Sequence, residues 1–401
     1  MLLKGKRILL GVTGSIAAYK AAHLIRLLIK DGAEVQVVMS TSALDFITPL
    51  TLSTLSKKPA LHEFYNPVNG EWNNHVELGL WADLFLVAPS SANTLAKFAN
   101  GLCDNLLTAT YFSSKCPVML APAMDLDMYQ HPSVRDNLSK LREFGNIVLD
   151  PESGELASGL LGQGRLMEPE HIIEKIIKFF HSQKEFSGKR FLITAGPTYE
   201  AIDPVRYIGN HSSGKMGVAI AEEIAARGGD VILILGPSAI EVSHPYIQTI
   251  RVTSASEMYD KSHNFHGEVD VCVFAAAVAD YSPLYPATGK IKKEDAEITI
   301  LLKKNIDIAR TLGGMKKPHQ IHVGFALETN EEEANAREKL NKKNFDMVVL
   351  NSLNDKGAGF KHDTNKVTFL FKDGKKEITE LLPKKVIARL IVDSVKNLSS
   401  Q

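Results

Sequence analysis

Two short segments of the sequence combine glycine and serine where a strand is expected to pass into a helix. The first, LLGVTGSIAAYKA, places Gly11 and Gly14 at this junction, and the second, GNHSSGKM, offers Ser212, Ser213 and Gly214. Backbone N–H groups at a helix start, together with the positive end of the helix dipole, receive phosphate groups. Both segments therefore predict a local anion-binding site, one in each half of the chain.

Neither segment matches a common nucleotide-binding motif in full. GNHSSGKM fits the G-x-x-x-x-G-K part of a P-loop, but Met216 stands where Ser or Thr would bind magnesium, and a polar run precedes it instead of a strand. A dinucleotide-binding domain needs GxGxxG followed about 20 residues later by an acidic residue. Neither half supplies that pair. A P-loop NTPase and an NAD(P)-dependent oxidoreductase are therefore disfavoured.

The composition requires any anion binding to be local. Lysine and arginine number 46 and aspartate and glutamate number 46, so no overall field would attract nucleic acid or an anionic membrane. Cys103, Cys116 and Cys272 form no CxxC pair and are too few for a disulfide framework or a cysteine zinc site. We expect no export signal and no membrane span. The sequence thus predicts a cytoplasmic protein with neither nucleic-acid nor membrane partners.

The elements expected to position these residues alternate between strand and helix, as the apolar spacing indicates. Residues Pro151 to Glu168 carry four glycines without periodicity and predict a mobile flap. In the first half the expected strands are Arg7–Val12, Glu34–Met39, Leu84–Ala88 and Val118–Ala121, and the expected helices are Ser15–Lys30, Asn93–Ser113 and Glu170–Phe180.

A polar, unpatterned segment from His181 to Lys189 separates this series from a second one. Because 401 residues exceed what one hydrophobic core supports, we expect two Rossmann-like three-layer α/β domains, residues 1–181 and 190–401, joined by a linker at 182–189. In the second half the expected strands are Arg190–Thr194, Val231–Leu235, Val269–Ala275, His322–Ala326 and Asp346–Leu350, with helices Lys215–Arg227 and Glu331–Asn344 and a hairpin of Lys366–Phe371 and Glu377–Leu382.

Five blocks of the first half stand in the same order as in a known enzyme family. They are HVEL at His75–Leu78, APSSANT at Ala88–Thr94, NGLCDNLL at Asn100–Leu107, APAMD at Ala121–Asp125 and GELASGLLGQGR at Gly154–Arg165. The first half thereby resembles the flavin-dependent cysteine decarboxylases. The resemblance implies a flavodoxin-like flavoprotein domain with FMN as cofactor. It also implies a redox-neutral decarboxylation of phosphopantothenoylcysteine to 4'-phosphopantetheine, in which the thiol is oxidised to a thioaldehyde before carbon dioxide leaves.

The same resemblance implies roles for individual residues. His75 matches the catalytic histidine, which handles the proton that moves with thiol oxidation. Asp125 stands where the family has Asn, and an ionised Asp would repel the substrate carboxylate unless it is protonated, turned away or paired with a cation. Ser158 replaces the cysteine that protonates the enethiolate, and serine is a much weaker acid. The residues expected to bind FMN are Gly14, Ser15, Ile16, Ser40, Ser91, Ala92, Asn93, Thr94, Ala123 and Met124.

From Arg190 to Val367 the sequence resembles the phosphopantothenate-cysteine ligases almost continuously. The matching runs are ITAGPTYEAIDPVRYIGNHSSGKMG, AAAVADY, KIKK, NIDI, VGFALET and KLNKKNFD. The resemblance implies that the carboxylate of 4'-phosphopantothenate attacks the α-phosphorus of CTP and releases pyrophosphate. The amine of L-cysteine then attacks the acyl-cytidylate, and CMP leaves. The C-terminal half is therefore expected to be a nucleotide-binding ligase domain.

This second resemblance also implies individual roles. Lys290, Lys339 and Lys343, with Mg²⁺, would stabilise charge at the α-phosphate and on pyrophosphate. Asn210 matches a position that processes the acyl-cytidylate, and Asp280 would contact the nucleotide or the metal. The residues expected to bind CTP are Ser212, Ser213, Gly214, Ala275, Ala276, Asp280, Lys290, Asn305, Ile306, Asp307, Ile308, Phe325, Lys339 and Lys343.

Three of these features also have a structural explanation. His75 can be a histidine beside a buried strand, KIKK a solvated charge run, and Phe325 a core residue at a strand end. For the protein as a whole, the departures at Asp125 and Ser158 leave an alternative open. In this alternative an active ligase half is joined to an impaired or regulatory decarboxylase half. The resemblances further imply homo-oligomers, with decarboxylase trimers and ligase dimers that together give a dodecamer.

Overall fold

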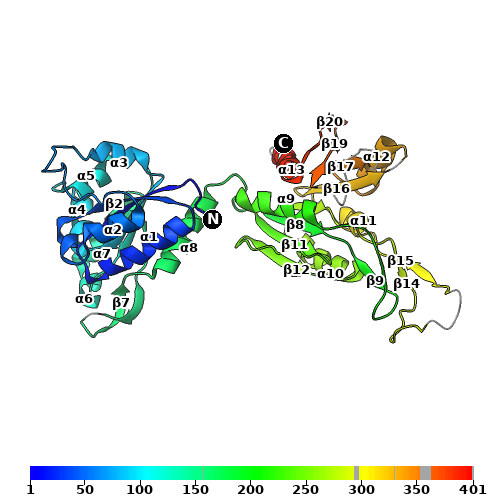
Figure 1. Cartoon of the computed structure of the whole chain (residues 1–401), viewed down its shortest axis with the longest axis horizontal. Coiled ribbons are helices and arrows are strands. Elements are labelled where there is room, and N and C mark those ends of the chain that lie inside the picture. The colour runs from blue at the N-terminus through cyan, green and yellow to red at the C-terminus, as the bar shows by residue number, and fades with distance from the viewer. Residues whose placement is uncertain (157, 293–297, 329, 353–362, 400–401) are drawn as a thin grey trace. The chain divides into compact units, whose positions relative to one another are not determined.

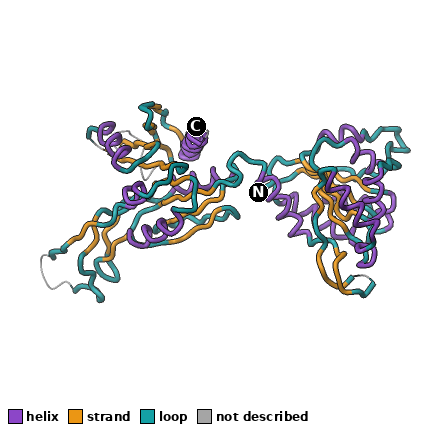
Figure 2. The backbone as a smooth tube through the Cα atoms, turned by 180° about the vertical axis from the view of Figure 1, so that it is seen from behind, coloured by secondary structure: helices purple, strands orange, loops and turns teal. Residues whose placement is uncertain are grey.

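The structure, a computed structural model, describes residues 1–156, 158–292, 298–328, 330–352 and 363–399. The chain folds into two compact units, Met1–Phe180 and His181–Gln401 (Figure 1). Residues 182–189, expected as a linker, lie within the second unit, where Phe186 is 3% exposed and packs in the core. In each unit helices cover both faces of a sheet (Figure 2), as the predicted three-layer α/β architecture requires.

The first unit is built on a parallel sheet with strand order β2-β1-β3-β4-β5. Side chains alternate across this sheet, since Ile8 and Leu10 join the core on one face and Leu9 joins the core on the other. The strands are β1 (Arg7–Val12), β2 (Glu34–Met39), β3 (Leu84–Ser90), β4 (Val118–Pro122) and β5 (Ile147–Val148). The helices are α1 (Lys20–Lys30), α2 (Pro49–Ser56), α3 (His75–Trp81), α4 (Ala92–Asn100), α5 (Leu106–Ser113), α6 (Leu126–Gln130), α7 (Pro132–Glu143) and α8 (Pro169–Ser182).

Three expected elements of the first unit differ in detail. The helix expected from Ser15 begins as a 3-10 turn, Ile16–Tyr19, and continues as α1. The stretch expected as helix around Asn93 to Ser113 is divided at Gly101, whose left-handed conformation (φ 75°) ends α4. The glycine-rich flap, predicted without regular structure, contains an antiparallel hairpin of β6 (Glu152–Glu155) and β7 (Leu161–Arg165).

The second unit is built on an eight-stranded sheet with the order β12-β11-β8-β13-β16-β17-β19-β20. The first six strands are parallel and follow the Rossmann order. They are β8 (Arg190–Ala195), β11 (Asp230–Leu235), β12 (Ile247–Arg251), β13 (Val271–Phe274), β16 (Ile321–Glu328) and β17 (Met347–Ser352), followed by the antiparallel β19 (Val367–Phe371) and β20 (Lys376–Ile378). The helices are α9 (Lys215–Ala226), α10 (Ala255–His266), α11 (Ile308–Gly314), α12 (Glu332–Lys342) and α13 (Lys384–Ser399).

Among the described residues of the second unit, three two-stranded pieces lie outside the main sheet: β9 (Tyr199–Ala201) with β10 (Tyr207–Gly209), β14 (Tyr281–Pro283) with β15 (Leu302–Lys304), and β18 (Thr364–Asn365) with β21 (Leu382–Pro383). The predicted C-terminal hairpin is confirmed as β19 and β20, but its second strand ends at Ile378, and Leu382, expected at its end, lies in β21. Strand β12 was not predicted, because it lies at the sheet edge and only Ile247 of its residues is buried. Within the described part of the chain, no helix is both long and apolar enough to cross a membrane.

Candidate active sites

A cavity of about 460 Å³ lies at the carboxyl ends of the strands in the first unit. In the order 2-1-3-4-5, the strands on either side of the switch point are β1 and β3, and flavodoxin-like folds bind their ligand there. Thr13 joins the two loops concerned: its hydroxyl donates to Pro89 O (2.8 Å) and accepts from Ser91 N–H (2.9 Å). Thr13 was not predicted as a site residue, because both partners are remote along the chain.

Nine of the ten residues expected to bind FMN line this cavity, and Ile16 lines a neighbouring one. Gly14 is required by a close approach, since a Cβ atom there would lie 2.6 Å from Ser42 Cβ. Ser15 caps the following 3-10 turn by accepting from Ala17 N–H, and Ser91 caps α4 by accepting from Thr94 N–H. Residues that line the cavity but were not predicted are Thr41, Ser42, Lys97, Asp104, Asn105 and Met128. Asp104 and Asn105 lie inside the NGLCDNLL block, so the resemblance of this block to the family could have predicted them as cavity residues.

A second cavity of about 430 Å³ shares Ser15, Ala123 and Met124 with the first. Asp125 lines it as the N-cap residue of α6, with one buried carboxylate oxygen, Oδ1, that has no hydrogen-bond partner among the described residues. Lys20 and Arg165 line the same cavity, but both are paired with Glu168, at 2.9 and 2.7 Å. The structure therefore shows no cation paired with Asp125 among the described residues.

The glycine-rich hairpin forms one wall of this second cavity. Met124 N–H donates to Gly164 O (3.0 Å), and a Cβ at Gly164 would lie 2.3 Å from Met124 O. A Cβ at Gly162 would lie 2.8 Å from Leu126 Cδ1. The glycines thus let β7 press against the segment that carries Asp125. Ser158 lies exposed at the hairpin tip and lines neither cavity.

His75 lies apart from both cavities. It begins α3, behind the cap residue Asn74, and its ring meets Phe64 and Trp72 edge-on at 6.2 and 6.1 Å. Its Nδ1 is buried without a hydrogen-bond partner among the described residues. Figure 1 shows α3 at the opposite end of the first unit from α6 and β7. One copy of the chain does not bring His75 and Asp125 together.

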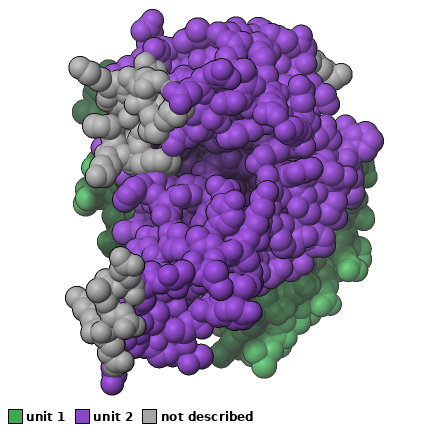
Figure 3. Space-filling view, turned by 90° about the vertical axis from the view of Figure 1, so that its right-hand side faces the viewer, with its two compact units in different colours: residues 1–180 green, residues 181–401 purple. Residues whose placement is uncertain are grey.

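Two cavities of about 140 and 270 Å³ lie at the carboxyl ends of β13 and β16 in the second unit, and both are lined by Ala276 and Phe325. Strands β8 and β13 flank the switch point of the Rossmann order, where nucleotides bind. Figure 3 shows one face of this unit, which is hollowed near its centre. Of the residues expected to bind CTP, Ser212, Ser213, Gly214 and Ala275 line the smaller cavity, and Asp280, Asn305, Ile306, Asp307, Ile308, Lys339 and Lys343 line the larger.

The turn before α9 has the features expected of an anion-binding helix start. Gly214 is its N-cap with φ 77°, a conformation that favours glycine. Gly214 N–H donates to Ser212 Oγ at 3.4 Å, and Ser238 Oγ donates to Ser213 O at 2.8 Å. Gly217 lets the helix approach β8, since a Cβ there would lie 2.5 Å from Ala195 Cβ.

The lysines of the larger cavity are already paired with carboxylates. Lys339 Nζ lies 2.6 Å from Glu328, and Lys343 Nζ lies 3.0 Å from Asp307, which also caps α11. These pairs offset the mutual repulsion of the lysines, and a polyphosphate can exchange with the carboxylates as the partner of either ammonium group.

The structure places Asn210 beside these cavities. Its Nδ2 donates to Val278 O at 2.9 Å and to Ala277 O at 3.3 Å, and these two residues line the larger and smaller cavities respectively. Asp280 belongs to no cluster of three or more ligating side chains among the described residues. Its predicted contact with a metal stays a prediction.

Lys290 is exposed and lines none of these cavities. Its loop is anchored by a buried Asp203, whose carboxylate accepts from Ile291 N–H (3.2 Å) and from the Arg206 guanidinium. The hydrogen-bonded Arg206 holds the pKa of Asp203 well below its usual range. The last residue of the predicted KIKK run, Lys293, lies outside the described residues.

Two families match the two units. The Flavoprotein family matches residues 2–181, and the DNA/pantothenate metabolism flavoprotein C-terminal domain matches residues 186–398. Fold, cavities and these matches together define a two-domain α/β flavoprotein.

Curated relatives cover nearly the whole chain. The coenzyme A biosynthesis bifunctional protein CoaBC of Bacillus subtilis is 42% identical over 402 residues, which is 100% of this chain and 99% of the relative. The CoaBC protein of Vibrio vulnificus is 41% identical over 99% of this chain and 98% of the relative. A protein from an unknown prokaryotic organism, named cysteine/cysteine sulfinic acid decarboxylase, is 50% identical over 87% of this chain and 98% of the relative. The chain belongs to the CoaBC family of bifunctional flavoproteins.

Proposed function

We propose that this protein catalyses two consecutive steps of coenzyme A biosynthesis. The C-terminal unit joins L-cysteine to 4'-phosphopantothenate at the expense of CTP, and the N-terminal unit decarboxylates the resulting phosphopantothenoylcysteine to 4'-phosphopantetheine. The observation that carries this proposal is the 42% identity to a CoaBC protein over 100% of the chain. It is supported by cavities at the switch points of both sheets. The names of these relatives describe a decarboxylase and bifunctional proteins of coenzyme A biosynthesis. They give no support to the alternative of a purely regulatory decarboxylase half.

In the ligase unit the chain's own residues supply positive charge and hydrogen bonds. The turn of Ser212 to Gly214 receives the triphosphate through backbone N–H groups. Lys339 and Lys343 stabilise negative charge that develops during attack on the α-phosphate. Mg²⁺, held by Asp280 together with phosphate oxygens, fits the usual preference of this ion for one or two carboxylates plus substrate phosphates. In the same proposal the amide of Asn210 exchanges Ala277 O and Val278 O, to which it donates in the structure, for the carbonyl of the acyl intermediate.

In the decarboxylase unit the residues present fit FMN. Gly14 leaves the space that a Cβ would fill, and the caps at Ser15 and Ser91 start helices at the cavity. Bound FMN supplies the oxidation of the substrate thiol and the later return of hydride. The hairpin with Gly162 and Gly164 covers the substrate and excludes water.

We propose that a second copy of the chain completes the decarboxylase site. His75 lies away from the cavities of its own chain, and its ring nitrogen Nδ1 lacks a partner among the described residues. We therefore assign the protein to a homo-oligomer in which His75 of one copy takes up the thiol proton at the cavity of another. The three cysteines are free, in keeping with a reducing cytoplasm.

The test is a complete reaction with purified protein, 4'-phosphopantothenate, L-cysteine, CTP and Mg²⁺, followed by mass spectrometry. We expect 4'-phosphopantetheine and carbon dioxide without any added reductant, and a weaker reaction when ATP replaces CTP. A requirement for NADPH would contradict the scheme. Lys290→Gln should impair ligation and leave decarboxylation of supplied phosphopantothenoylcysteine unchanged, whereas loss of both activities would argue against two separate sites.

Free cysteine is a second candidate substrate of the first unit. One relative, 50% identical to this chain, is named cysteine/cysteine sulfinic acid decarboxylase. The unpartnered carboxylate oxygen of Asp125 also favours a substrate with a positive charge. Free cysteine carries an ammonium group at the carbon that bears the carboxylate, and phosphopantothenoylcysteine has a neutral amide there. Carbon dioxide release from cysteine alone, without CTP and 4'-phosphopantothenate, tests this candidate.

A further inference from the structure

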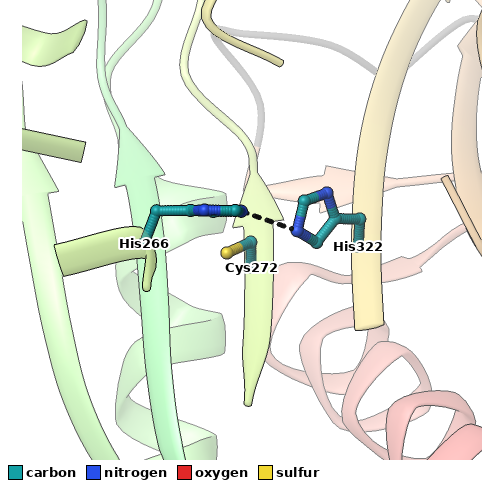
Figure 4. A group of neighbouring side chains, drawn as sticks. All are labelled: His266, Cys272 and His322. Atoms are coloured by element: carbon teal, nitrogen blue, oxygen red, sulfur yellow. Dashed lines mark hydrogen bonds between the residues drawn. The ribbon is translucent and has the colours of Figure 1, made fainter. Parts of the chain in front are cut away.

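A cluster of three ligand-type side chains lies in the core of the second unit, away from the proposed active sites. Cys272 of β13 and His322 of β16 are register partners on adjacent parallel strands, so both side chains leave the sheet on the same face. His266, at the end of α10, approaches them from the helix layer (Figure 4). All three residues are buried, with exposed fractions of 2% for His266 and 0% for the other two.

The ligand atoms are spaced as a single metal ion would require. The Nε2 atoms of His266 and His322 are 3.2 Å apart, and the ligand atoms of all three residues lie within 4.8 Å of one another. Two imidazole nitrogens bound to one ion at about 2.0 Å are separated by roughly 3.3 to 3.5 Å in tetrahedral or trigonal geometry. The two imidazole nitrogens are thus close to the separation that one ion requires, and the Cys272 thiol lies within 4.8 Å of a ligand nitrogen of each histidine.

All three side chains are buried, and burial disfavours the charged form of each. Desolvation lowers the pKa of His266, lowers that of His322 to about 3, and raises that of the Cys272 thiol. Nδ1 of His322 has no hydrogen-bond partner among the described residues. A hydrogen bond between the two rings would satisfy their Nε2 atoms. It does not explain why a thiol lies beside them. Neutral imidazoles are the protonation state that binds metals.

We propose that His266, Cys272 and His322 form a binding site for monovalent copper. Cu⁺ forms a bond to Sγ, the S–H bond breaks, and the proton leaves to solvent, so no oxidation state changes. One positive charge enters as one leaves, and the buried cluster stays neutral. Soft thiolate ligands suit Cu⁺ and Zn²⁺ among first-row metals, and the charge balance with a single thiolate favours Cu⁺.

Zinc fits the same cluster less well, for two reasons. Structural zinc sites are almost always four-coordinate, and the cluster offers three ligands among the described residues. Zn²⁺ with one thiolate would also leave a net positive charge in an apolar core. The nearby ammonium of Lys316, paired with Asp346 at 2.6 Å, adds to that cost.

The test titrates the reduced, full-length protein anaerobically with Cu⁺ in competition with a chromogenic Cu⁺ chelator. We expect one Cu⁺ per chain, and X-ray absorption should show one sulfur and two nitrogen neighbours. Failure to retain Cu⁺ against the chelator, or an ion bound by sulfur without imidazole, would overturn the site. A parallel titration with Zn²⁺ should give weaker binding, and tighter binding of Zn²⁺ would overturn the choice of ion.

Variants locate the ion within the chain. Cys272→Ala should lose the bound Cu⁺, whereas Cys116→Ala, which removes a thiol from the first unit, should keep it. The reverse pattern would refute the proposal. If Cys272→Ala does not fold, the sulfur and nitrogen neighbours seen by X-ray absorption of the unmodified protein still decide the question.

Discussion

At the scale of single residues, we expect the charge of Asp125 to influence which substrate the second cavity of the first unit accepts. Its buried Oδ1 has no hydrogen-bond partner within the described part of the chain, and Lys20 and Arg165 of the same cavity are paired with Glu168. Two unit charges about 4 Å apart interact by about 4 kcal/mol at an effective dielectric constant of roughly 20. An ionised Asp125 therefore works against a substrate carboxylate and in favour of a substrate ammonium group.

Asp125→Asn should separate the two candidate substrates. Removal of the negative charge is expected to raise kcat/KM for phosphopantothenoylcysteine by about tenfold or more, since about 1.4 kcal/mol corresponds to a factor of ten. It should lower kcat/KM for free cysteine. Carbon dioxide release from each substrate is the measurement, with Asp127→Asn as a control on the exposed side of the same helix. A parallel fall for both substrates would mean that Asp125 supports the cavity and does not select between them.

At the scale of elements, the flavin cavity depends on how closely the loop after β1 approaches the loop after β2. Gly14 has an ordinary backbone conformation, so its requirement is one of space: a Cβ would lie 2.6 Å from Ser42 Cβ. Thr13 fixes the same loop to Pro89 and Ser91. A side chain at position 14 must therefore displace the loop after β2, which carries Ser42, away from the cavity.

Gly14→Ala should weaken FMN binding and leave the fold intact. A displacement of this kind costs about 1–3 kcal/mol, and we expect FMN affinity to fall roughly ten- to hundredfold. Quenching of FMN fluorescence on titration with apoprotein gives the affinity, and circular dichroism checks the fold. Gly314→Ala, at a glycine with no atom near its Cβ position, is the control and should bind FMN normally. Unchanged affinity in Gly14→Ala would mean that the cofactor does not use this turn.

At the scale of the whole molecule, we propose that more than one copy of the chain forms the decarboxylase site. Helix α3 with His75 and the wall formed by α6 and β7 lie at opposite ends of one unit (Figure 1). A homo-oligomer can bring these surfaces together, whereas a single chain does not. The ligase cavities, by contrast, gather most of their predicted residues from one copy.

Co-expression of two inactive variants tests this shared site. His75→Asn should stop the pathway at phosphopantothenoylcysteine, and Gly14→Val should block the cavity. If one copy supplies the histidine and another the cavity, mixed oligomers contain some intact sites and recover 4'-phosphopantetheine formation. Each variant expressed alone serves as the control. Persistent inactivity of the co-expressed pair would place His75 and its cavity in the same copy.

The sequence by itself determined the repeating strand and helix pattern of both units, and it predicted the two glycine- and serine-containing turns as anion-binding sites. These are local properties, because a strand buried on both faces needs a continuous apolar run and a helix needs apolar residues at its own spacing. Strand β12 escaped prediction because an edge strand with one buried residue carries no such pattern. The hairpin of β6 and β7 escaped because its glycines serve close packing against Met124 and Leu126 and leave no alternation to detect.

Only the tertiary structure decided which distant residues meet. Thr13 reaches Ser91, Glu168 gathers both Lys20 and Arg165, and Cys272 meets His322 across two strands. His75, which the sequence placed in the same site as Asp125, stands apart from it within one chain. The physical reason is that such contacts depend on loop closure, strand order and the pairing of charges across the fold, none of which leaves a periodic trace along the chain.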